Sequence, residues 1–84
     1  MRVELSSRAE KQFEKLDRNK ALQDKIIEQL AQIGKDPLIG KPLEGEFEAL
    51  RSCRIGEWRI IYDIDKRRNL VLISRIAKRS EVYK

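Results

Sequence analysis

The side chains that could perform chemistry in this sequence are mainly cationic, because the chain contains no histidine and a single cysteine, Cys53. One cysteine excludes an internal disulfide framework. Without histidine, the usual zinc sites and Cys/His nucleophile pairs are unavailable. Any catalysis must therefore use arginine, lysine, tyrosine or carboxylate groups, and we expect neither a cofactor nor a metal ion.

The basic residues are concentrated in the C-terminal part of the chain. Of the formal net charge of +5, residues 1–50 contribute −1 and residues 51–84 contribute +6, from ten Lys or Arg against four Asp or Glu. A concentrated basic surface attracts polyanions, and phosphate contacts dominate affinity for nucleic acids. RNA, DNA and an acidic protein partner all fit this distribution, and so does a solvated surface that only keeps a small domain soluble.

The length of 84 residues, 40% of them hydrophobic, suits one compact domain over residues 1–84. Folding hides about 60–65% of the surface of a chain of this size, so a surface site is favoured over an enclosed pocket. The apolar run at residues 70–73 is far shorter than the ~20 residues of a membrane span. The N-terminus also lacks the apolar stretch of a signal peptide. These features predict a cytoplasmic protein without membrane contact.

The elements that must position the basic residues begin with a short strand and two helices. Val3 and Leu5 alternate with polar residues, and residues 7–10 have the spacing of a capping box that starts a helix near Ser7. The apolar stripes are Ala9, Phe13 and Leu16 in the first helix and Leu22, Ile26, Leu30 and Ile33 in the second. Residues 17–19 separate the two helices, and Gly34 and Pro37 end the second.

The remaining sequence predicts three strands, at residues 47–55, 58–64 and 70–77, after a Pro- and Gly-containing connection at residues 35–45. Two short turns make them an antiparallel meander. The predicted fold is therefore α+β with the order β-α-α-β-β-β, a four-stranded, mainly antiparallel sheet with a helical hairpin on one face. In the middle strand Trp58, Ile60 and Tyr62 point toward the helices, so Arg59 is expected on the uncovered face.

Two segments of this sequence resemble a known family. Residues 50–62, LRSCRIGEWRIIY, resemble the signature of the RelE/ParE toxin superfamily, and residues 78–83, KRSEVY, resemble its closing motif. The resemblance implies the toxin of a type II toxin–antitoxin system, neutralised by a cognate, RelB-like antitoxin through an acidic helical segment. RelE-like members cut mRNA in the ribosomal A site, whereas ParE-like members inhibit DNA gyrase, so one fold implies two functions.

A RelE-like activity implies attack of a 2′-hydroxyl on the adjacent phosphate, which needs a base, a proton donor and groups that stabilise phosphate charge. The residues that match the family pattern are Arg59, Arg79 and Tyr83 as catalytic groups and Arg54 and Lys78 as substrate-binding groups. Arg59 and Arg79 suit the stabilisation of phosphate charge, and Arg79 is also the candidate proton donor. Tyr83 is implied as the base or as a surface for a nucleobase, with Glu81 as an alternative base.

The sequence departs from the family pattern at two positions. Leu50 and Ser52 stand where some strongly cleaving relatives carry lysines, so the basic cluster is thinner. Three hypotheses stay open: a ribosome-dependent mRNA endoribonuclease, a ParE-like gyrase inhibitor without catalysis, and a degenerate toxin that only binds antitoxin. Whether Lys78 or Arg79 holds the main phosphate position also stays open.

Overall fold

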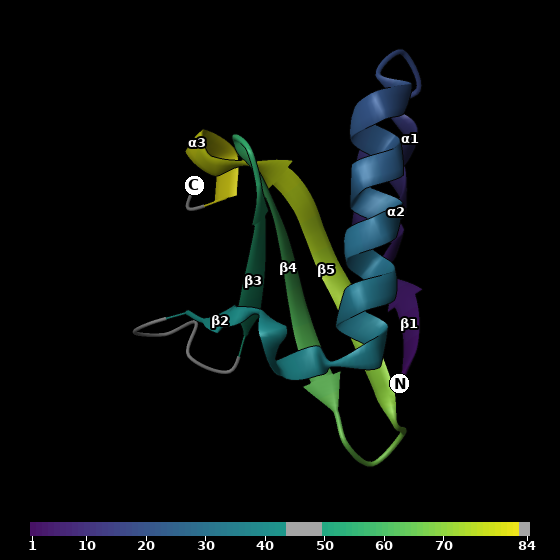
Figure 1. Ribbon diagram of the computed structural model, residues 1–84, viewed down its shortest axis with the longest axis vertical. Helices are drawn as coiled ribbons and strands as arrows, with labels where there is room; N and C mark the ends of the chain where they lie inside the picture. Colours follow the sequence, from purple (N-terminus) through teal and green to yellow (C-terminus); the bar gives the residue numbers. More distant parts are fainter. Residues whose placement is uncertain (44–49, 83–84) are drawn as a thin grey trace.

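A computed structural model of the chain describes residues 1–43 and 50–82, in which a mixed sheet is accompanied by two main helices (Figure 1). The strands are β1 (Arg2–Leu5), β2 (Lys41–Pro42), β3 (Arg51–Ile55), β4 (Trp58–Asp65) and β5 (Leu70–Lys78). The helices are α1 (Ser7–Glu14), α2 (Lys20–Lys35) and the short α3 (Arg79–Val82), with a 3₁₀ turn η1 (Pro37–Ile39). The spatial order of the strands is β1-β5-β4-β3-β2, with β1 parallel to β5 and the other pairs antiparallel.

The predicted α+β class and element order are confirmed, but the sheet has five strands in the described residues rather than four. The additional strand is β2, in which Lys41 pairs with Ser52 and Pro42 with Arg51. Proline cannot donate to a ladder and is confined to sheet edges, so the sequence of this segment resembles a loop. The strand predicted at residues 47–55 begins at Arg51, and its residues 47–49 lie outside the described residues.

Both helices begin at side-chain caps. The Ser6 hydroxyl accepts a hydrogen bond from the Ala9 amide at 3.1 Å, so Ser6 is the N-cap of α1 and the capping box predicted from Ser7 is wrong by one residue. Asn19 caps α2 in the same way, its Oδ1 accepting from the Leu22 amide at 3.1 Å. Asn19, in the segment predicted to separate the two helices, is therefore also the residue that starts the second helix.

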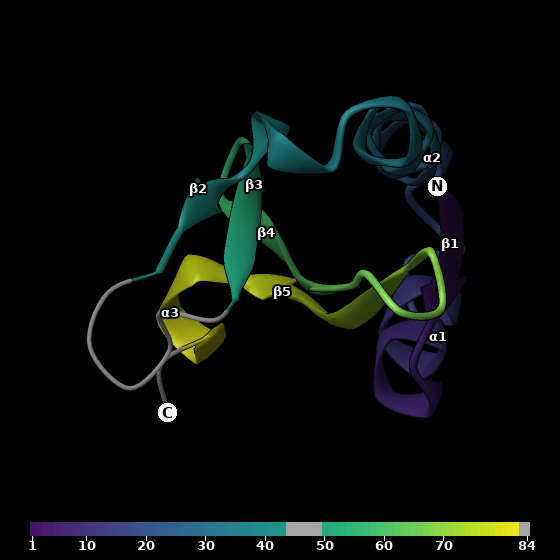
Figure 2. The ribbon, with the colours of Figure 1, turned by 90° about the horizontal axis from the view of Figure 1, so that it is seen from below.

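Helices α1 and α2 lie on the side of the sheet formed by β1 and β5. Strands β2 and β3, together with the short helix α3, lie on the other side of the molecule (Figures 1 and 2). Ile26 and Ile33 of α2 are fully buried in a core that they share with Ile60 and Tyr62 of β4. Where β1 ends, α1 continues along β5, and Gln12 Oε1 accepts a hydrogen bond of 2.7 Å from a β5 amide. Within the described residues, each helix is too short or too polar to cross a membrane.

The opposite face of the sheet is not bare. Ile61 and Ala77 alternate with the helix-side residues and are 5% and 3% exposed, because Leu43 and Leu50 pack against them. The register of β4 against β5 shifts next to this cluster, since Ile61 pairs with Arg75 but Tyr62 pairs with Ile73. As expected, the helices do not cover this face of the sheet. The centre of the face is nevertheless covered by the second apolar cluster.

Candidate functional site

The hairpin of β3 and β4 places two arginines directly opposite each other. Its register pairs Ile55 with Trp58 across a two-residue turn, and therefore Arg54 with Arg59. Residues in such a pair project from the same face with Cβ atoms about 4.5–5.5 Å apart, where like charges repel. Because Trp58 and Ile60 pack into the helix-side core, Arg54 and Arg59 lie on the other face, as the alternation predicts for Arg59.

The two arginines line an open groove of about 580 Å³, which we call the arginine groove. Its other lining residues are Gly56, Glu57, Lys78, Arg79 and Ser80. A smaller hollow of about 370 Å³ shares Arg54 and Arg59 and extends toward Lys41 and Gln29. The residues that line the arginine groove thus include three arginines, one lysine and one glutamate, and this excess of cationic residues favours an anionic ligand.

The guanidinium group of Arg59 has an unsatisfied donor. Its Nε atom is buried and has no hydrogen-bond partner among the described residues. Buried polar atoms in folded proteins are nearly always paired, and an unpaired one costs stability. Arg59 also lines the arginine groove, and the planar fork of an arginine is suited to contact with the oxygens of a phosphate.

The turn Gly56-Glu57 contacts both other arginines of the groove. The Gly56 carbonyl accepts a hydrogen bond of 3.0 Å from Arg54 Nε. The Glu57 carbonyl accepts one of 2.8 Å from the backbone amide of Arg79, at the start of α3. The turn therefore brings the basic residues of the C-terminal tail to the hairpin that carries Arg59.

Lys78 and Arg79 differ in their surroundings, although both line the arginine groove. Lys78 pairs with Trp58 across β4 and β5, and its ammonium group lies 5.9 Å from the centroid of the Trp58 ring. A cation at that distance is attracted to the ring face, which engages the Lys78 charge. Both residues are exposed, and they differ in that the backbone amide of Arg79 donates to the Glu57 carbonyl beside the groove.

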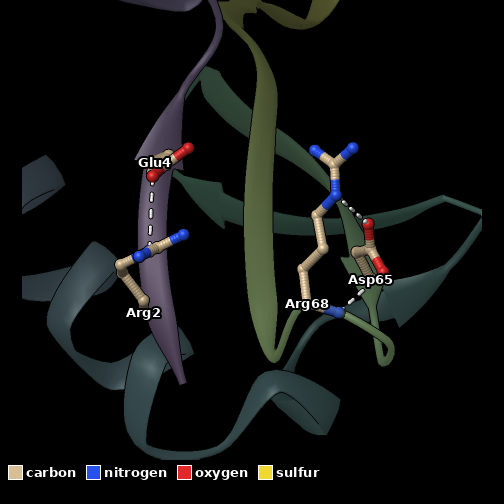
Figure 3. Close-up of polar contacts among 4 residues, drawn as sticks. All are labelled: Arg2, Glu4, Asp65 and Arg68. Atoms are coloured by element: carbon tan, nitrogen blue, oxygen red, sulfur yellow. Dashed lines mark hydrogen bonds and ion pairs between the residues drawn. The ribbon is translucent and has the colours of Figure 1, made fainter.

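The ion pairs shown in Figure 3 lie near the opposite end of the sheet. Arg2 pairs with Glu4 at 3.3 Å on β1, and Arg68 pairs with Asp65 at 3.6 Å in the turn between β4 and β5. Among the described residues, no carboxylate forms an ion pair with Arg54 or Arg59. Within residues 1–43 and 50–82, Arg54 and Arg59 thus have no carboxylate partner.

The positions where lysines are missing have structural roles. Leu50 packs on the second apolar cluster, and Ser52 is 8% exposed opposite Ile61. Beside the arginine groove, these two positions are thus occupied by one apolar and one nearly buried polar uncharged residue. Arg75 pairs with Ile61 on this face too.

The candidate bases are described only in part. Tyr83 lies outside the described residues, and Glu81 belongs to α3 with only its backbone described. The carboxylate found in the lining of the arginine groove is Glu57, which the sequence analysis missed. The sequence signal that could have found Glu57 is its place in the two-residue turn before Trp58 and Arg59. A residue in this turn lies at the end of the sheet where β4 begins and Arg59 lies.

Two further ionisable groups are excluded from chemistry by their burial. The Tyr62 hydroxyl donates to the Pro37 carbonyl at 2.6 Å and accepts from the Gly40 amide at 2.9 Å. Burial raises the pKa of Tyr62 above its ordinary 10.0 and that of the Cys53 thiol above 9.0, mainly by desolvation. Both groups therefore stay protonated at neutral pH, and the Tyr62 hydroxyl holds the connection between α2 and β2 in place.

Comparisons with known proteins agree on one family. The model of the family described as ParE toxin of type II toxin-antitoxin system, parDE, matches residues 3–83. Toxin RelE of Mycobacterium tuberculosis (strain ATCC 25618 / H37Rv) is 44% identical over 46 residues, which are 55% of this chain and 47% of that protein. Toxin RelG of the same strain is 36% identical over 53 residues, 62% of this chain and 61% of that protein. The matches thus span about half of one relative and about three fifths of the other.

A solved structure extends the similarity to the fold. The crystal structure of the toxin–antitoxin complex RelBE2 from Mycobacterium tuberculosis contains a chain that is 29% identical to this one, with a TM-score of 0.81. The alignment covers 93% of this chain and 96% of that chain. The arrangement of sheet and helices described above is therefore shared over nearly the whole length of both proteins.

Proposed function

The chain belongs to the ParE toxin family of type II toxin–antitoxin systems, and from this premise we propose that it is a RelE-like endoribonuclease that cuts mRNA in the ribosomal A site. The observation that carries the proposal is the pair Arg54 and Arg59 on one face of the β3–β4 hairpin, with an unsatisfied buried N–H on Arg59. The similarity to RelE and RelG supports the same choice.

The proposed reaction needs no histidine. The 2′-oxygen attacks the adjacent phosphorus, a bond forms between them, and the bond from phosphorus to the 5′-oxygen breaks, which leaves a 2′,3′-cyclic phosphate and a 5′-hydroxyl. Negative charge grows on the phosphate oxygens in the transition state, where the donors of Arg54, Arg59 and Arg79 would stabilise it.

Two protons move in this reaction. Tyr83 or Glu81 would take the proton of the 2′-hydroxyl, and Arg79 would give one to the leaving 5′-oxygen. These roles come from the family resemblance. The position of Arg79 in the lining of the arginine groove supports its share in them, and the cation–π contact of Lys78 supports Arg79 over Lys78.

The partner that we propose is a cognate antitoxin with an acidic helical segment. The solved relative is a toxin–antitoxin complex, and the arginines of the arginine groove suit acidic side chains as well as phosphates. An antitoxin that reaches these cations would neutralise the toxin by charge as well as by obstruction.

The experiment that tests the proposed function is primer extension on mRNA bound to ribosomes, with free RNA as a control. The wild-type protein should cut only ribosome-bound message, at a fixed position within the A-site codon. The double variant Arg59→Ala/Arg79→Ala should lose at least about 10³-fold in cutting rate, since removing one donor to a transition-state oxyanion costs about 10²–10³-fold.

The matched control is Lys66→Ala/Arg67→Ala, which removes the same charge from the exposed turn at the other end of β4. It should cut like the wild type. Undiminished cutting by Arg59→Ala/Arg79→Ala would refute the site, and equal losses in both double variants would show that net charge alone matters.

A second candidate function is ParE-like inhibition of DNA gyrase. The observations that favour it are the uncharged residues Leu50 and Ser52 beside the arginine groove and the ParE description of the matching family. If the wild type makes no cuts on ribosome-bound mRNA, a gyrase supercoiling assay decides between this function and a degenerate toxin that only binds antitoxin. Inhibition of supercoiling would establish the former.

A further inference from the structure

We propose that the turn Gly56-Glu57 is a positioning element for the arginine groove, and that the left-handed backbone of Gly56 is what allows it to act. The turn contributes no guanidinium of its own. Its proposed role is to hold Arg54 and Arg79 on either side of Arg59. The link to catalysis rests on the proposed function, whereas the link to the geometry of the groove does not.

Two successive carbonyls of the turn hold two different arginines. Gly56 O accepts from the side chain of Arg54 at 3.0 Å, and Glu57 O accepts from the backbone of Arg79 at 2.8 Å. The first bond directs a guanidinium group along the hairpin, and the second fixes the start of α3 against it. A single peptide segment thus sets the distance between elements that are far apart in sequence.

Arg59 is placed independently of the turn. It lies within the ladders of β4, opposite Arg54 on one side and Ala77 on the other. A change in the turn should therefore leave Arg59 in place but release the side chain of Arg54 and the backbone of Arg79. Chemistry that needs several donors on one phosphate is sensitive to this, because misplacement by about 1 Å can cost about 10²-fold in rate.

Gly56 has a φ of +57°, in the left-handed region where side chains other than glycine and asparagine are strained. A Cβ atom at this position would meet no other atom within 4 Å. A substitution therefore acts through backbone conformation alone, without a steric clash. If the backbone leaves this region, the carbonyls of residues 56 and 57 turn away and both hydrogen bonds are lost.

The structure offers a matched control for backbone strain. Asn69 has a φ of 52° in the turn between β4 and β5, at the other end of the sheet from the arginine groove. The variants Gly56→Val and Asn69→Val impose the same kind of strain on two turns of the same sheet. Gly56→Asn is the conservative variant, since asparagine tolerates the left-handed region.

The first measurement is amide hydrogen exchange at Arg79, which reports the bond to Glu57 without any RNA. In Gly56→Val the Arg79 amide should exchange about tenfold faster than in the wild type. In Gly56→Asn and Asn69→Val it should stay within about threefold of the wild-type rate. Unchanged exchange in a folded Gly56→Val protein would overturn the proposal.

The second measurement is kcat and KM for cutting of ribosome-bound mRNA, corrected for the folded fraction of each variant. Gly56→Val should lose about 10–100-fold in kcat, Gly56→Asn should recover most of it, and Asn69→Val should retain wild-type kcat. An equal loss in Asn69→Val would overturn the positioning role, because strain in any turn would then suffice. A wild type that makes no cuts would refute the proposed function, and the exchange rates would still decide whether the turn holds Arg79.

Discussion

Replacing Arg59 by methionine should stabilise the fold while it removes the proposed activity. Repulsion from Arg54 on the opposite strand costs about 0.2–1 kcal/mol, and the buried Nε–H without an acceptor costs about 1–3 kcal/mol. Methionine keeps an unbranched stem of similar length, so most of the packing of the arginine stem remains, though not all. The expected net gain in the free energy of unfolding is about 1–2 kcal/mol.

Urea unfolding followed by circular dichroism measures this gain. With a slope of about 1–3 kcal/mol per molar urea, the midpoint of Arg59→Met should rise by roughly 0.5–1 M. Salt should stabilise the wild type more than the variant, because it screens the repulsion. The control Arg68→Met removes an arginine that is 75% exposed and should change the free energy by less than about 0.5 kcal/mol.

The reasoning would be refuted by an Arg59→Met protein that is less stable than the wild type. Such a result would mean that the Arg59 guanidinium contributes to stability in solution, so that its placement in the groove serves the fold. A gain in stability with undiminished cutting of mRNA would instead separate Arg59 from the chemistry. The stability measurement therefore tests whether the Arg59 guanidinium destabilises the fold, and the cutting measurement tests whether it takes part in the reaction.

Three other predictions concern the framework of the site. Tyr62→Phe removes a hydroxyl with two buried hydrogen bonds to the backbone and should cost about 2–3 kcal/mol in urea unfolding, and a cost below 0.5 kcal/mol would contradict the bridging role. Because burial raises the pKa of Tyr62 and Cys53, the unfolded state releases their protons first. The stability that the two groups contribute should therefore be fully present below pH 9.0, begin to fall above 9.0 for Cys53 and fall further above 10.0 for Tyr62, and the fall should be smaller in Tyr62→Phe/Cys53→Ala. Gln12→Leu leaves the Ile76 amide without its acceptor and should cost about 1–2 kcal/mol, whereas Gln12→Glu, which keeps an acceptor, should cost less in the same titration.

Local patterns were sufficient to predict most elements of this fold. The stripe with Ile26 and Ile33 predicted α2, and the alternation around Ile60 predicted which face of β4 meets the helices. The errors arose where tertiary contacts override local signals. Two adjacent serines could each cap α1, and the one whose hydroxyl also donates to the Ser74 carbonyl of β5 is Ser6. Strand β2 escaped prediction because its two residues gain their conformation only by pairing with β3.

The sequence by itself determined the chemistry available at the site: arginines in place of histidine, a two-residue turn before Trp58, and a period of two that puts Arg54 and Arg59 on one face. These are properties of neighbouring residues, so periodicity reveals them. Only the tertiary structure decided that Arg79 approaches the turn, that Lys78 lies over Trp58, and that Arg59 Nε is buried without a partner among the residues that the structure describes. Those facts depend on the register of β4 against β5, which is set by packing across the whole sheet and by no short stretch of sequence.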